Sequence, residues 1–84
     1  MFEKNVVIGL DSGLEERPIA LIVQMASQYD SSVYLLSGNK RVNAKSIMGM
    51  MGLGMKSGDS ITIVADGVDE GLAVAELERY LSGQ

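Results

Sequence analysis

The spacing of apolar residues changes repeatedly within this chain of 84 residues, which limits the folds that it can adopt. From Phe2 to Leu10, apolar residues occupy alternate positions, which predicts a half-buried β-strand. From Glu16 to about Tyr29 they recur every three or four residues, which predicts a helix packed on a core. Pro18 falls in the first turn of that helix, where its missing N–H costs nothing. Both kinds of element are therefore expected in a short chain.

The rest of the chain continues the alternation of strands and helices. The predicted order β-α-β-β-α-β-α favours an α+β fold, an open-faced sandwich in which a four-stranded antiparallel sheet carries three helices on one face. The length of 84 residues predicts a single domain over residues 1–84. After the first strand and helix, the predicted elements are strands 32–37 and 40–44 joined by a Gly38-Asn39 hairpin turn, a short helix from Ser46 to Leu53, a strand over 60–66, and a last helix with Asp69 as N-cap and Gly83 as stop.

Composition excludes several kinds of function. The chain has neither cysteine nor histidine, so disulfides, thiolate metal sites, histidine metal sites and phosphohistidine are ruled out. The net charge of -4 argues against direct nucleic-acid binding, which needs a basic face. The longest apolar runs are far too short to span a membrane, and the first residues do not resemble a signal peptide. We expect a soluble cytoplasmic protein without metal or cofactor.

Two stretches together resemble the HPr phosphocarrier family. SGLEERPIALIV, residues 12–23, is similar to the active-site loop of that family, with Gly13, Arg17 and Pro18 in register. VNAKSIMGMMGL, residues 42–53, is similar to its regulatory segment. The resemblance extends over the whole chain and implies an HPr-like fold.

The residue at position 15 separates this chain from ordinary HPr proteins. There the resemblance implies the histidine that carries phosphate, but this chain has Glu15. The closer resemblance is to the Crh subgroup, catabolite repression HPr, which lacks this histidine and keeps the regulatory serine. Glu15 could accept phosphate as an acyl phosphate, although neighbouring Glu16 adds like-charge repulsion and the sequence shows no activating base or metal. It could instead stabilise the start of the helix, or mimic a phosphorylated loop by its charge.

Ser46 has two readings. By residue type alone it is a helix N-cap, a common role for serine. Its place in NAKSIMG implies, from the resemblance, that HPr kinase/phosphorylase phosphorylates it. Lys45 and Arg17 are the cations expected to neutralise the added charge.

An apolar surface is expected around Ser46. Methionines are ordinary core fillers, and we place Met50, with Leu53, in the core; clustered exposed methionines are also typical of protein-binding surfaces. The resemblance implies that this surface docks the kinase and catabolite control protein A, a LacI-type transcription regulator. The residues expected to bind these partners are Arg17, Ala20, Leu21, Gln24, Lys45, Ser46, Ile47, Met48 and Met51.

Three functions remain open from the sequence. The first is a non-enzymatic regulator in carbon catabolite control, switched by phosphorylation of Ser46. The second is a phosphocarrier that uses Glu15. The third is an unphosphorylated scaffold or sensor that shares only the fold, because fold alone does not fix function. The assembly is expected to be a monomer or a strand-exchanged homodimer.

Overall fold

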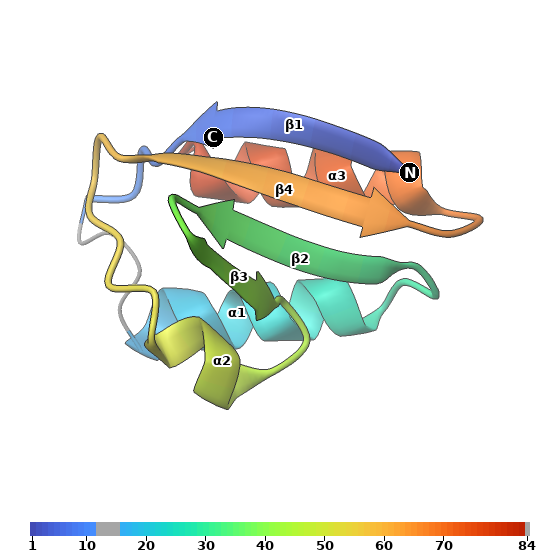
Figure 1. Ribbon diagram of the computed structural model, residues 1–84, viewed down its shortest axis with the longest axis horizontal. Helices are drawn as coiled ribbons and strands as arrows, with labels where there is room; N and C mark the ends of the chain where they lie inside the picture. The colour runs from blue at the N-terminus through green and yellow to red at the C-terminus, as the bar shows by residue number, and fades with distance from the viewer. Residues whose placement is uncertain (12–15, 84) are drawn as a thin grey trace.

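The computed structural model describes residues 1–11 and 16–83, and it confirms the predicted order of elements. The four strands form one antiparallel sheet in the order β1-β4-β2-β3, so β1 and β3 are the edge strands. With the helices packed on one face, the fold is the expected open-faced sandwich (Figure 1). The elements are β1 (Phe2–Val7), α1 (Glu16–Ser27), β2 (Ser32–Ser37), β3 (Lys40–Asn43), α2 (Ile47–Met51), β4 (Ser60–Asp66) and α3 (Glu70–Leu81).

The core lies between the sheet and the helices. Ile22 of α1, Leu35 of β2, Ile63 of β4 and Leu77 of α3 are all fully buried. Each comes from the apolar face that its spacing predicts, because the period of each element turns these side chains inward. Phe2 lies on the same alternating face as Val6 and Ile8, but it is 44% exposed where they are buried, since it begins an edge strand with a neighbour on one side only.

Two helices are shorter than predicted. α1 ends at Ser27, although Tyr29 beyond it still packs against the core. α2 ends at Met51, because Gly52 serves as its C-cap and Gly54 adopts a positive φ of 61° that a helix cannot continue. None of the helices within residues 1–11 and 16–83 is long and apolar enough to cross a membrane.

The exit of β1 is fixed against the C-terminal end of α3. The Gly9 N–H donates a hydrogen bond to the Leu81 carbonyl at 2.7 Å, and the Gly58 N–H donates to the Ile8 carbonyl at 2.7 Å. Gly9 passes so close to Ser82 that a side chain at position 9 would collide with the Ser82 carbonyl group. This contact joins the beginning of the chain to its end.

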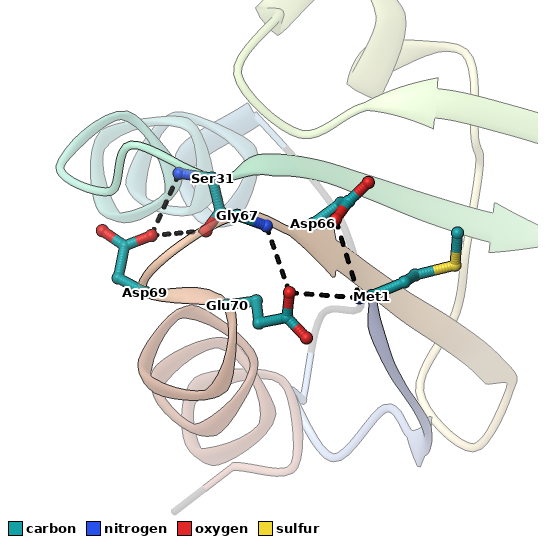
Figure 2. Close-up of polar contacts among 6 residues, drawn as sticks. All are labelled: Met1, Ser31, Asp66, Gly67, Asp69 and Glu70. Atoms are coloured by element: carbon teal, nitrogen blue, oxygen red, sulfur yellow. Dashed lines mark hydrogen bonds and ion pairs between the residues drawn. The ribbon is translucent and has the colours of Figure 1, made fainter.

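Asp69 occupies the predicted N-cap position of α3, but its side chain does not cap that helix. Its carboxylate accepts hydrogen bonds from the backbone N–H groups of Asp30 at 2.9 Å and Ser31 at 3.0 Å, and from the Ser31 hydroxyl. Figure 2 shows the carboxylate turned towards buried Ser31, beside a second group of contacts around Glu70. Asp69 therefore ties the turn before β2 to the turn before α3.

Asp69 should make stability depend on pH. The Ser31 hydroxyl bond, followed by the backbone N–H bonds, lowers the pKa of the Asp69 carboxyl below its ordinary value. A lowered folded-state pKa stabilises the fold above the unfolded pKa, and the contribution is lost as the pH falls through the folded pKa. We expect the free energy of unfolding to decrease below about pH 4, the ordinary aspartate range. Urea unfolding between pH 7 and pH 3 measures it.

Asp69→Asn is the matched control for this pH dependence. Its amide does not titrate, so its stability should fall less steeply with acid than that of the wild type. The comparison also removes the contribution of Glu70, whose pKa is lowered mainly by its hydrogen bond from the Gly67 N–H. Parallel stability curves for the two proteins would contradict the assignment.

Candidate functional site

A tight turn between β3 and α2 positions Ser46. The Asn43 side chain accepts a hydrogen bond from the Lys45 N–H at 2.8 Å, and its carbonyl accepts one from the Ser46 N–H at 3.0 Å. Ala44 is fully buried, and its N–H donates to the Val33 carbonyl at 2.9 Å. Each residue has a distinct role in the turn: Asn43 accepts two hydrogen bonds, Ala44 is buried, and Ser46 leads into α2.

Ser46 is the N-cap of α2, as its residue type predicts. Its backbone is extended, and its Oγ accepts a hydrogen bond from the Gly49 N–H at 3.3 Å. The side chain is only half-buried, and the bond uses Oγ as an acceptor, so the hydroxyl proton is not consumed by the cap. The geometry leaves Ser46 chemically available at the surface.

Exposed apolar residues follow this serine in the helix that it caps. Met50 turns inwards and is fully buried, whereas Ile47, Met48 and Met51 of the same helix are 49%, 88% and 59% exposed. α2 lies against α1 (Figure 1), whose predicted surface residues are also exposed. We call the predicted set the Ser46 surface: Arg17, Ala20, Leu21, Gln24, Lys45, Ser46, Ile47, Met48 and Met51.

Three cationic side chains lie in or near α1 and α2, and their positions decide which of them could meet a charge on Ser46. The Lys45 ammonium donates a hydrogen bond to the Tyr29 carbonyl at 2.8 Å, just beyond the end of α1. Lys40 similarly donates to the Gly52 carbonyl at 3.1 Å, at the end of α2. Arg17 is exposed in the first turn of α1. The bond to Tyr29 uses one of the three donors of the Lys45 ammonium and leaves its charge in place, so neutralisation of a charge on Ser46 by Lys45 stays a prediction.

Glu15 lies outside the described residues. Its three predicted roles therefore stay predictions: phosphate acceptor, charge at the start of the helix, or phosphate mimic.

Sequence reasoning missed two features near the helices. Met55, in the glycine-rich loop after α2, is buried, and its sulfur accepts a hydrogen bond from the Ser37 hydroxyl at 3.0 Å. A shallow hollow of about 250 Å³ is lined by residues of α1 and α3, namely Met25, Glu76, Arg79 and Tyr80. The spacing of the last three along one helix face was the available signal for this hollow.

The comparison with known families decides the classification. The family description "PTS HPr component phosphorylation site" matches residues 2–82. The chain belongs to the HPr family. Within that family it is similar to the HPr-like protein Crh of Bacillus subtilis (strain 168), with 43% identity over 81 residues, which cover 96% of this chain and 95% of that protein.

Solved HPr and Crh structures agree with the fold. The crystal structure of the phosphocarrier protein HPr from Bacillus anthracis str. Ames has a TM-score of 0.92 at 40% identity, with 95% of both chains covered. A crystal structure of Bacillus subtilis Crh, described as an intertwined dimer with a swapping domain, has a TM-score of 0.77 at 43% identity and covers 96% of this chain and 93% of its own.

Proposed function

We propose that this HPr-family protein is a cytoplasmic regulatory protein of the Crh type, without enzymatic activity, that acts in carbon catabolite control. HPr kinase/phosphorylase phosphorylates Ser46, and the phosphoprotein then binds a LacI-type catabolite control protein as its corepressor. The observation that carries this proposal is a half-buried N-cap serine beside three exposed apolar side chains on α2.

The absence of histidine from the sequence argues against a carrier role in the sugar phosphotransferase system. The family's phosphoacceptor position holds Glu15, whose carboxylate would have to approach an anionic phosphoryl donor. The sequence shows no histidine that could serve as the base to activate such a nucleophile. Regulation through Ser46 needs none of this chemistry from the protein itself, because the kinase supplies the catalytic groups.

Phosphorylation would change charge at the site more than fold. The kinase transfers the γ-phosphoryl group of ATP to Ser46 Oγ, which loses its proton. A phosphate oxygen is then placed to accept the hydrogen bond that Gly49 N–H now donates to Oγ. The phosphate adds a charge of about -1.5 to -2 beside the apolar side chains. A partner with a basic group next to an apolar pocket can therefore distinguish the two forms.

Ser46→Ala should abolish phosphorylation. After incubation with HPr kinase/phosphorylase and ATP, the wild type should gain about 80 Da, the mass of one phosphoryl group. Ser46→Ala should gain nothing, and Ser57→Ala, which removes an exposed serine of the loop before β4, should behave like the wild type. Intact-mass spectrometry with peptide mapping gives the result, and a phosphate mapped to another residue would refute the proposal.

Binding to the regulator is the second half of the same test. The phosphorylated wild type should bind the LacI-type protein at least about tenfold more tightly than the unphosphorylated form, since charge-assisted hydrogen bonds to phosphate are strong. Titration calorimetry measures both affinities. Equal affinities of the phosphorylated and unphosphorylated forms for the LacI-type protein would contradict the corepressor role, even if Ser46 is phosphorylated. A hydroxylamine-sensitive adduct formed with enzyme I and phosphoenolpyruvate would support the carrier alternative instead.

A strand-exchanged dimer is proposed as a second form of the protein. β1 is the first strand, lies at the sheet edge and pairs with β4, so it can be replaced by the same strand of another copy without altering the interior of the sheet. The Crh structure described as a swapped dimer supports this form. Light scattering after size-exclusion chromatography tests it, and a single monomeric species at every concentration would exclude it.

A further inference from the structure

The six methionines of the chain differ sharply in exposure. Met48 and Met51 belong to the Ser46 surface and are 88% and 59% exposed. Met50 lies between them in sequence and is fully buried, and Met55 is 8% exposed with its sulfur hydrogen-bonded to the Ser37 hydroxyl. One five-residue helix therefore presents two accessible thioethers and hides a third.

A thioether needs little from its surroundings to be oxidised. Its sulfur lone pair attacks the terminal oxygen of a hydroperoxide, a sulfur–oxygen bond forms, the oxygen–oxygen bond breaks, and water or an alcohol leaves. The sulfur loses two electrons and the peroxide gains them. Because no acid, base or metal is required from the protein, access to the sulfur controls which methionine reacts.

We propose that Met48 and Met51 form a methionine-oxidation site for hydroperoxides and that their sulfoxides disable the Ser46 surface. A sulfoxide replaces a flexible apolar side chain by a polar one, so a partner that buries it must desolvate a dipole. The modified atoms belong to the next turns of the helix that Ser46 caps. Oxidation would thus weaken the partner binding that phosphorylation of Ser46 promotes, while the phosphate itself stays in place.

Met48 and Met51 are proposed because they are exposed within the Ser46 surface, and the other methionines serve as controls. Met1 is also exposed, at 78%, but lies where its amino group pairs with Asp66 and Glu70, beside the turn that leads into α3 (Figure 2). Oxidation of Met1 therefore reports chemical accessibility without altering the Ser46 surface. Met25 is half-buried against the core on α1 and offers a methionine outside that surface.

The first experiment maps the modification on the full chain and needs no partner. Folded protein is treated with graded hydrogen peroxide, and each methionine is followed by peptide mass spectrometry. Met48 and Met51 should oxidise at least about tenfold faster than Met50 and Met55, and the difference should vanish in urea, because unfolding exposes every sulfur. Equal rates for all four in the folded protein would overturn the proposal.

The second experiment tests the consequence and rests on the proposed function. Wild type, Met48→Leu/Met51→Leu and Met25→Leu are phosphorylated, treated with peroxide, and titrated with the LacI-type regulator, each against its own untreated sample. Peroxide should weaken binding about tenfold or more for the wild type and Met25→Leu, and should leave the double variant at its untreated affinity. A similar loss in all three would overturn the inferred disabling. If untreated phosphoprotein does not bind at all, the corepressor proposal fails together with that consequence, while the oxidation map is judged separately.

Discussion

Met50→Ala is expected to lower the free energy of unfolding by about 2–5 kcal/mol, the usual effect of truncating a fully buried large apolar side chain. Met50 is the one buried residue within α2, and a helix of five residues has little stability of its own. Losing this anchor should loosen α2 as well as the core. Urea unfolding followed by circular dichroism gives the magnitude.

Met50→Leu is the matched control, because it keeps an apolar side chain of similar volume. Its cost should stay below about 1.5 kcal/mol. Met50→Ala should also slow Ser46 phosphorylation at temperatures where the protein remains folded, whereas Met50→Leu should not. If Met50→Ala were as stable as the wild type, the Ser46 surface would not depend on the core.

Gly9→Ala is expected to cost about 1–3 kcal/mol, as overpacking usually does. A Cβ at position 9 would collide with the Ser82 carbonyl oxygen and lie 2.7 Å from the carbonyl carbon. Both obstructing atoms belong to the backbone, so either the last turn of α3 or the exit of β1 must move. The hydrogen bond from the Gly9 N–H to the Leu81 carbonyl should weaken with it. Hydrogen exchange of that amide, together with urea unfolding, measures both effects.

Gly71→Ala provides the opposite expectation in the same protein. Gly71 is the second residue of α3, and a Cβ added there would meet no atom within 4 Å. Alanine should raise the free energy of unfolding by at most about 0.5–1 kcal/mol, the difference between the two residues in the middle of a helix. If Gly9→Ala left the free energy of unfolding unchanged or raised it, as expected for Gly71→Ala, the contact between β1 and α3 would not be as tight as described.

Much of the fold follows from local patterns in the sequence. The helical period of α1 and α3 and the Gly38-Asn39 turn are local signals, and each predicts the element found there. The ends of α1 and α2 were predicted too late. Tyr29 and Leu53 keep the apolar spacing of a helix and pack on the core after the helical backbone has stopped.

Contacts between distant segments could not be predicted in this way. Asp69 has the residue type and position of an N-cap, yet its carboxylate accepts its hydrogen bonds from Asp30 and Ser31 of another turn. Gly9 falls within the strand predicted from Phe2 to Leu10, but β1 ends at Val7, and the collision that requires glycine at position 9 arises only with α3 in place. The exposure of Met48 and Met51 was predictable because it follows from the period of one short helix, whereas the hydrogen bond that holds Lys45 to Tyr29 depends on how α1 ends.

The position of β1 also governs how the protein is made. β1 leaves the ribosome first, but β4, the strand beside it, is the last strand to be synthesised. The sheet therefore cannot close until β4 has been synthesised, and pairing over such a separation in sequence is slow. Until then the open edge of β1 is available to an unfinished neighbour on the same messenger. We therefore expect dense translation to favour exchange of β1 between copies, so that the amount of dimer depends on how the protein is produced as well as on its final concentration.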